Sequence, residues 1–227
     1  MLLGSGIIRR RVGGGGGPGP VEWQTFAERD FTAMADVTTY AGPTSSVDAV
    51  LENYANSSSG AWTLQDGRVK SNNTVARTLA GLVEGDFAPF RARVTGMLAN
   101  NTQRIVMRGK TDAVYDARVS GKISAELIRL AVDDVRLRVY VGTALRIDYQ
   151  IPVAPDFWTA VDWGAEIDAD GLITLRHNNA DVGTYEMTGA EITEYTGNML
   201  FGVMLDASTS NNATNGGYEY LHLEVAS

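Results

Sequence analysis

Apolar and polar residues alternate in short runs through most of the chain after about residue 61. In the run 135–141, the odd positions hold valine or leucine and the even positions hold arginine or tyrosine. The run 145–153 likewise has aliphatic residues or tyrosine at its odd positions. Successive side chains of a strand point to opposite faces, so a period of two residues predicts half-buried β-strands. Further runs lie at 62–65, 68–71, 74–79, 87–98, 103–109, 113–119, 122–131, 158–167, 171–177, 181–187, 199–206 and 218–225.

Turn-forming dipeptides separate several of these runs. Asp66-Gly67, Asp170-Gly171 and Asn215-Gly216 are typical of tight turns, because glycine, asparagine and aspartate tolerate positive φ angles. Many short strands joined by such turns predict an all-β protein, an antiparallel β-sandwich of the jelly-roll type. Strands do not alternate with helical segments along the chain, so a doubly wound nucleotide-binding fold is not expected.

The first twenty residues differ in composition from the rest. The segment MLLGSGIIRRRVGGGGGPGP holds eight of the 25 glycines and three arginines, and it has no acidic residue. Five consecutive glycines lose much backbone entropy when they are ordered, and a glycine- and proline-rich stretch is typical of a linker. We therefore expect an extended arm at 1–20 and a sandwich domain at 21–227, with its jelly-roll core at about 60–227.

Charge is divided between the arm and the body. The formal net charge is −8, but without the three arginines of the arm the remaining 16 basic and 27 acidic residues give −11 for 21–227. We expect the arm to bind another protein or another copy of this chain, with apolar anchors and with basic side chains that meet an acidic surface. The residues proposed for this contact are Leu2, Leu3, Ile7, Ile8, Arg9, Arg10 and Arg11.

The same features argue against two other kinds of partner. Three arginines beside an acidic body are a small footprint for nucleic acid, so no nucleic-acid partner is expected. The apolar stretch of the arm is short and precedes the arginines, unlike a secretory signal, and no run reaches the length that spans a bilayer. We therefore expect neither export by such a signal nor a membrane partner.

Cysteine and histidine are scarce, which limits the possible chemistry. The chain has no cysteine and two histidines, so disulfides, thiolate metal sites and cysteine nucleophiles are excluded and no cofactor is expected. Calcium is the metal that we weigh, because it takes several oxygen ligands. The candidate ligands are Asp156, Asp206, Asn211 and Asn212, and a solvated loop is the preferred interpretation of all four.

The stretch FWTAVDWGAEIDADGLITLRHNNADVGTYEM, residues 157–187, resembles a strand pair of concanavalin A-like sandwiches of the laminin G type. Trp158 and Trp163 would lie in the first strand, and Asn178-Asn179 would form the small hairpin where that family often has Asn-Gly. Residues 61–71 and 218–225 are similar to the terminal strands of such domains. The resemblance covers about residues 60–227 and implies the fold more strongly than any activity.

A sandwich behind a short glycine-rich arm is also similar to small structural proteins of tailed bacteriophages. This resemblance implies a non-enzymatic virion component, namely a tail-fibre, tail-tip or head-decoration protein that joins other virion proteins through its arm. It also implies a homo-oligomer that is made in the host cytoplasm, resides in the virion and attaches to a glycan of the host surface. The alternatives are a carbohydrate-binding module outside a virion and, ranked third, a glycoside hydrolase.

One acidic run is the main candidate for catalysis. Glu166, Asp168 and Asp170 are spaced two residues apart, and retaining β-glucanases of the same fold carry a similar Glu-x-Asp-x-Glu run with a nucleophile first and an acid/base last. In this sequence the last position is an aspartate, and Asp168-Ala169-Asp170-Gly171 is typical of a turn. We therefore prefer a structural turn, and we expect no catalytic residue and no enzyme.

Aromatic side chains are the candidates for sugar binding, because their faces stack on sugar rings. The tryptophans are expected mainly in the core. The tyrosines near predicted loops are better candidates for an exposed glycan-binding platform, and these are Tyr54, Tyr195 and Tyr218. His222 shares its strand parity with Tyr220 and Glu224, and a half-exposed strand histidine is its expected role.

Overall fold

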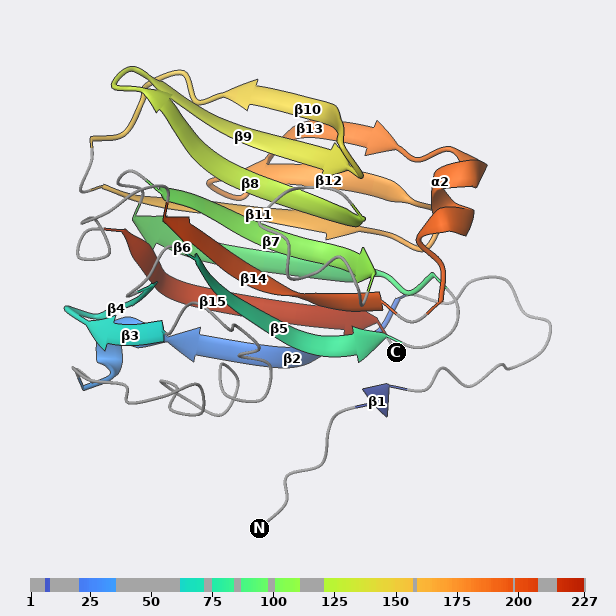
Figure 1. Ribbon diagram of the computed structural model, residues 1–227, viewed down its shortest axis with the longest axis horizontal. Coiled ribbons are helices and arrows are strands. Elements are labelled where there is room, and N and C mark those ends of the chain that lie inside the picture. The colour runs from blue at the N-terminus through green and yellow to red at the C-terminus, as the bar shows by residue number, and fades with distance from the viewer. Residues whose placement is uncertain are drawn as a thin grey trace, which may run out of the picture.

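Two β-sheets pack face to face in the computed structural model (Figure 1). The structure describes residues 7–8, 21–35, 62–71, 75–83, 87–97, 101–110, 121–156, 159–197, 199–207 and 216–226. Sheet A consists, in spatial order, of β1 (Ile7–Ile8), β5 (Val75–Val83), β14 (Met199–Ala207), β7 (Asn101–Lys110), β8 (Lys122–Ala131), β9 (Asp134–Val141) and β10 (Ala144–Gln150).

Sheet B forms the second layer. Its order is β13 (Ala180–Glu186), β12 (Leu172–His177), β11 (Ala160–Ile167), β6 (Phe90–Met97), β15 (Gly217–Ala226), β4 (Arg68–Ser71) and β3 (Trp62–Gln65), and β2 (Trp23–Asp30) also pairs with β15. All described pairings are antiparallel except that of β1 with β5. The predicted antiparallel sandwich is therefore confirmed.

The core lies between the two sheets and is built by the alternation that the sequence shows. On β9, Val135, Leu137 and Val139 are fully buried while the residues between them are partly exposed. On β11, Trp163 and Ile167 contribute in the same way from sheet B. Burying one aliphatic side chain of this size stabilises a fold by about 1.5–3 kcal/mol, so the two inner faces hold the layers together.

Four described elements were not predicted from the sequence, namely β1, the 3-10 helix η1 (Phe31–Ala33), β2 and the helix α2. β2 shows no regular alternation of apolar and polar residues. It pairs with β15, which is distant in sequence, so that Trp23 lies opposite Ala226. The helix α2 (Gly189–Glu194) is capped by Thr188. The Thr188 side chain accepts a hydrogen bond from the Glu191 amide, and the Glu191 carboxylate accepts one from the Thr188 amide. This capping box is readable in the sequence as Thr-x-x-Glu.

Three predicted turns are confirmed among the described residues. Asp66 and Gly67 take positive φ angles of 54° and 68° between β3 and β4. Asp168 Oδ1 accepts hydrogen bonds from the amides of Asp170 (2.9 Å) and Leu172 (2.8 Å), and Gly171 has a φ of +85°. At the β12–β13 hairpin, Asn178 and Asn179 take left-handed φ angles of 51° and 62°. Asparagine tolerates this region better than most residues, so the hairpin forms without glycine.

Only a small part of the arm belongs to the described residues. Ile7–Ile8 form β1, which pairs in parallel with Leu82 and Val83 of β5. The side chains proposed as anchors, those of Leu2, Leu3, Ile7, Ile8, Arg9, Arg10 and Arg11, lie outside the described residues, as do Tyr54 and the predicted run 113–119. Within the described ranges, no helix is both long and apolar enough to cross a membrane.

Candidate functional site

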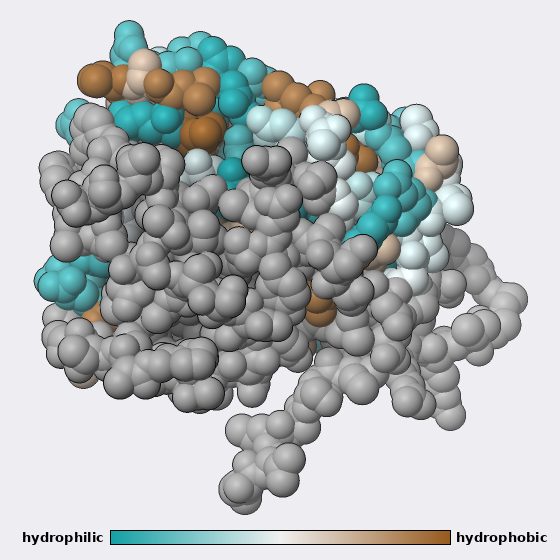
Figure 2. All heavy atoms as spheres, viewed as in Figure 1, coloured by the Kyte–Doolittle hydropathy of each residue, from teal (hydrophilic) through white to brown (hydrophobic). Residues whose placement is uncertain are grey.

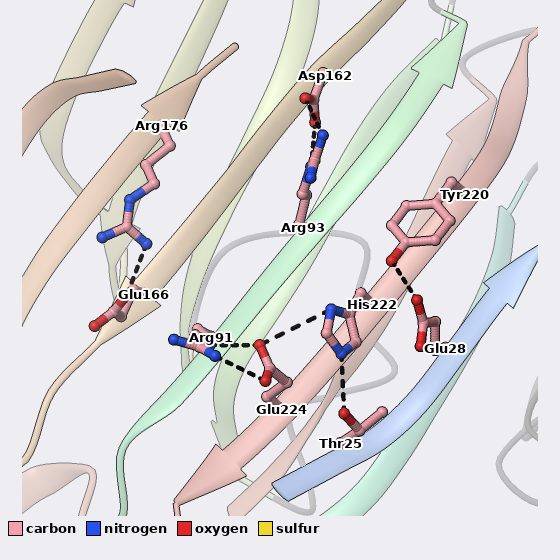
Figure 3. A network of polar contacts seen from close by, with 10 residues as sticks. All are labelled: Thr25, Glu28, Arg91, Arg93, Asp162, Glu166, Arg176, Tyr220, His222 and Glu224. Carbon is pink, nitrogen blue, oxygen red and sulfur yellow. Dashed lines mark hydrogen bonds and ion pairs between the residues drawn. The ribbon is translucent and has the colours of Figure 1, made fainter. Parts of the chain in front are cut away.

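The outer face of sheet B carries a continuous set of hydrogen-bonding side chains, which we call the polar face (Figure 3). On β11, Trp163, Ala165 and Ile167 point into the core, so Asp162 and Glu166 point to the opposite face. The neighbouring strands contribute by the same alternation. The members are Thr25, Glu28, Arg91, Arg93, Asp162, Glu166, Arg176, Tyr220, His222 and Glu224.

Cross-strand pairing arranges these side chains in rows. One row runs from β15 to β12 through His222, Arg93, Gly164 and Arg176. The next row runs through Glu224, Arg91, Glu166 and Thr174. Directly opposed residues of adjacent strands lie about 5 Å apart on one face, so the polar groups of four strands are brought together here.

Each arginine of the polar face is paired with a carboxylate. Arg93 makes a bidentate pair with Asp162, with N–O distances of 2.9 and 2.7 Å. Arg91 binds both oxygens of Glu224, and Arg176 donates to Glu166 at 2.6 Å and to Asp181 at 2.9 Å. Bidentate pairing fixes the planar guanidinium, so its remaining N–H groups keep a defined direction.

These pairs also keep the paired side chains of the polar face ionised. The hydrogen bond from Arg91 is the largest influence on Glu224, and it lowers the pKa of that carboxyl below its ordinary value. The hydrogen bonds that Arg91 and Arg93 donate to Glu224 and Asp162 raise the pKa values of the two arginines. Glu224 and both arginines therefore stay ionised at neutral pH.

Aromatic and neutral polar groups border the charged pairs on the β15–β2 side. The Tyr220 hydroxyl donates to Glu28 at 2.8 Å, and burial together with this bond raises the pKa of Tyr220 to about 12. His222 Nε2 lies 3.1 Å from Thr25 Oγ1, and the guanidinium of Arg91 lies 4.4 Å from the centre of the Trp23 ring. The border thus combines ring faces with hydroxyl and imidazole groups.

A hollow of about 170 Å³ opens at the middle of the polar face. Gly164 lies there in the row between Arg93 and Arg176 and contributes no side chain. A Cβ atom at this position would lie 2.5 Å from the carbonyl oxygen of Ala92, so the close approach of β6 requires glycine. The other lining residues include Arg91, Asp162, Asn179, His222 and Glu224.

The acidic run singled out in the sequence is not brought together as a catalytic set. Glu166 lies on the polar face, but β11 ends at Ile167. Asp168 and Asp170 belong to the following turn, where Asp168 caps the backbone and Asp170 is exposed. The preferred interpretation as a structural turn is confirmed, and the spacing of Glu166 and Asp170 does not place them on one strand face.

The prediction that Tyr195 and Tyr218 form an exposed platform is wrong. Tyr195 is buried between α2 and the turn at Gly142, and burial raises its pKa to about 12. Tyr218 is fully buried, and its hydroxyl bonds to Arg104 and Met204 of sheet A. A bulge at Glu219 reverses the parity of β15, so Tyr218 points inward although Tyr220 points outward.

No group of three metal-binding side chains is present among the described residues. Of the calcium candidates, Asp156 is exposed, whereas the side chain of Asp206 and both Asn211 and Asn212 lie outside the described residues. Arg91, Arg93 and Asp162 were not predicted as site residues from the sequence. Charged and apolar residues alternate on the two strands that carry them. This alternation predicts that the charged side chains point outward, but it does not predict which strands lie next to each other.

Comparison with known proteins identifies solved structures with the same sandwich. The endo-β-1,3-glucanase of Pyrococcus furiosus matches with a TM-score of 0.58 and 10% identity, over 91% of this chain and 96% of that chain. The catalytic domain of an endo-1,3-β-glucanase (laminarinase) of Thermotoga petrophila RKU-1 matches with a TM-score of 0.54 and 12% identity, over 90% and 98%. SCLam, a non-specific endo-β-1,3(4)-glucanase from family GH16, matches with a TM-score of 0.53 and 8% identity, over 91% and 93%.

These likenesses confirm the concanavalin A-like jelly roll, and at such identities they show the fold alone. No family model and no curated protein matches the sequence. The expectation that the chain is not an enzyme is not upheld, because catalytic domains of glucanases share this fold over nine tenths of the chain.

Proposed function

We propose that this protein binds a neutral glycan on the polar face of sheet B. The observation that carries the proposal is the solvent-facing hollow at Gly164, surrounded by side chains whose hydrogen-bonding groups are fixed by pairing. Sugar hydroxyls both donate and accept, so they match a surface that offers arginine N–H groups beside carboxylate oxygens. Binding needs little reorganisation, because the side chains are already held in place.

The charge balance of the polar face favours a neutral ligand. Arg91, Arg93 and Arg176 are matched by Glu224, Asp162 and Glu166, and Asp181 adds a further carboxylate. A sulfated or uronic acid chain would have to break these pairs to reach an arginine, and it would meet five carboxylates, since Glu28 also lies on this face. A neutral chain can bind without breaking any of them.

The size of the hollow indicates that it takes part of a longer ligand. Its volume of about 170 Å³ is below the roughly 300–1,000 Å³ of pockets that enclose a whole small molecule. The rows of polar groups continue on both sides along four strands. We therefore expect an oligosaccharide or polysaccharide that runs across the face, and β-1,3-glucan is the first to test because two of the similar structures are β-1,3-glucanases.

A glycan array probed with the full chain tests this function. We expect neutral glycans to be bound and Arg93→Ala to lower the affinity about tenfold or more, because hydrogen bonds to charged groups contribute roughly 1.5–3 kcal/mol. Arg136→Ala is the matched control, since Arg136 also pairs with carboxylates on a strand but lies in sheet A. Binding of no neutral glycan, or equal loss in both variants, would contradict the assignment.

Hydrolysis of the same glycan is the second candidate function. Asp162 and Glu166 lie on one face of β11 on either side of Gly164, and glycoside hydrolysis ordinarily uses two carboxyl groups. Asp162 and Glu166 are each already bound by an arginine. Glu224, the other carboxyl group beside the hollow, is a poor proton donor because its pKa is lowered. Binding therefore ranks first. Release of reducing ends from laminarin by the wild type, with loss in Glu166→Gln, would reverse this order.

We also propose that the arm at 1–20 attaches the glycan-binding body to a larger assembly, such as a phage tail fibre or head decoration. What supports this is the contrast between a basic, glycine-rich arm and a body of charge −11. Repeated copies on one particle would strengthen a weak glycan contact by multivalency. Deletion of residues 2–12 should leave a folded body that no longer joins its assembly, and continued incorporation of the truncated chain would refute the anchoring role.

A further inference from the structure

A second hollow lies at the end of the sandwich where β10 leads into β11. Its volume is about 510 Å³, within the roughly 300–1,000 Å³ of pockets that hold small ligands. Tyr149, Pro152, Val153, His177 and Asn178 contribute to its wall. Figure 2 shows brown residues next to teal ones in the upper left of the view, where Figure 1 places the end of β10, so this corner offers apolar and polar surface together.

Two aromatic rings with fixed orientations form part of this wall. Tyr149 of β10 and His177 of β12 lie with their ring centres 6.1 Å apart and their planes inclined by 52°. Tyr149 also packs on the core, and burial lowers the pKa of His177 below its ordinary value, so its ring is neutral at pH 7. Rings that are carried by strands and supported by the core keep their orientation when a ligand binds.

The hairpin tip at Asn178-Asn179 separates the two hollows. Asn179 contributes to the hollow on the polar face, and Asn178 contributes to the hollow at the sandwich end. The tip is fixed to β11, because the Asn178 amide donates to the Asp162 carbonyl at 2.9 Å. The two sites therefore share one rigid turn but present different chemistry, charged pairs on one side and rings with prolines on the other.

We propose that the end hollow is a second glycan site, which takes a pyranose ring against Tyr149 and His177. This inference rests on the proposed function, since it assigns a further sugar of the same neutral class to a separate site. A pyranose ring has an apolar C–H face that packs on an aromatic ring and a rim of hydroxyls. His177 and Asn178 belong to the same wall, and the imidazole of His177 and the side-chain amide of Asn178 can bond that rim.

An NMR titration of the full chain tests this site separately from the polar face. The probes are the hexasaccharides of β-1,3-glucan, cellulose and xylan, each added to isotopically labelled protein. With at least one of them we expect shifts at Asn178 and at the Tyr149 ring. Tyr149→Leu keeps the apolar packing and should weaken binding at this site about threefold to tenfold, the range expected for one lost ring contact. The matched control is Tyr140→Leu on the neighbouring strand β9, where the side chain lies on the outer face of the same sheet and away from this hollow.

The outcomes distinguish the two proposals. Shifts at Asn178 that need about threefold to tenfold more ligand in Tyr149→Leu, but not in Arg93→Ala, support the end site. Shifts confined to Gly164 and His222 would overturn the end site and leave the function of the polar face standing. Shifts confined to Tyr149 and Asn178 would support the end site and overturn the assignment of the polar face. The absence of shifts at Tyr149 and Asn178 with all three probes would overturn the end site.

Discussion

The outer faces of the two sheets carry the same kind of interaction in different surroundings. In sheet A, Arg104 of β7 pairs with Glu126 of β8 at 3.2 Å, and their side chains are only 10% and 4% exposed. In sheet B, Arg93 of β6 pairs with Asp162 of β11 at 2.7 Å, and their side chains are 51% and 22% exposed. Both pairs link adjacent strands on a face that points away from the core.

The difference in burial separates a structural pair from an accessible one. Buried charges lose their hydration, so each depends on its partner, and removing one partner of a buried pair costs about 3–5 kcal/mol. Exposed pairs contribute only about 0–1 kcal/mol, because water screens them. The polar face of sheet B can therefore use its charges for binding at little cost to the fold, whereas Glu126 in sheet A serves stability.

Glu126→Ala is expected to have the largest effect on stability. It leaves Arg104 without this counter-charge in buried surroundings, and we expect the free energy of unfolding to fall by about 3–5 kcal/mol. Urea denaturation measures the change. Glu186→Ala, at an exposed carboxylate of β13, is the control and should change stability little. A loss below 1 kcal/mol in Glu126→Ala would show that the two outer faces do not differ as described.

Tyr218→Phe tests the link between the two sheets. The mutation removes the hydroxyl that bonds to Arg104 and Met204 and leaves these buried groups with one fewer partner. We expect a loss of about 1–3 kcal/mol in urea denaturation, the usual range for an unsatisfied buried group. Glycan affinity should not change, because the ring lies inside the sandwich. A selective loss of affinity with unchanged stability would restore Tyr218 as a binding residue.

Much of this fold could be predicted from local sequence, because alternation alone identifies strands such as 135–141 and their inner faces. Two features escaped it for physical reasons. The bulge at Glu219 reverses the face of Tyr218, and no local pattern marks it. The burial of Glu126 could not be predicted either, because an acidic residue between Ala125 and Leu127 is equally typical of a strand whose outer face is exposed.

The candidate site was harder to predict than the fold. Arg93 is paired with Asp162, 69 positions further along the chain, and Arg91 with Glu224, 133 positions away. Such contacts depend on the order of strands in sheet B, which alternation does not determine. The turn at Asp168 was predictable, because its effect is confined to the next four residues.

Arg93→Ala should lower glycan affinity and change stability little, whereas Glu126→Ala should lower stability. Because the pair with Asp162 is solvent-facing, we expect unfolding free energy to fall by less than about 1 kcal/mol. Glycan affinity should nevertheless fall markedly, as the array experiment measures. Urea denaturation of Arg93→Ala and Arg136→Ala side by side provides the check. A loss above 2 kcal/mol in Arg93→Ala would mean that this pair supports the fold, and a fall in affinity would then be uninformative about binding.

The pH dependence of stability provides the smallest and most specific effect. The hydrogen bond from Arg91 lowers the pKa of Glu224 in the folded state below its ordinary value of 4.5, so the ionised carboxylate stabilises the fold. This contribution is fully present above about pH 4.5 and is lost as the pH falls through the folded-state pKa. Glu224→Gln removes the titration, so wild type and variant should differ most near pH 7 and converge toward pH 3. Parallel urea curves across this range measure the difference, and a gap that stays constant or widens on acidification would contradict the role of the Arg91 pair.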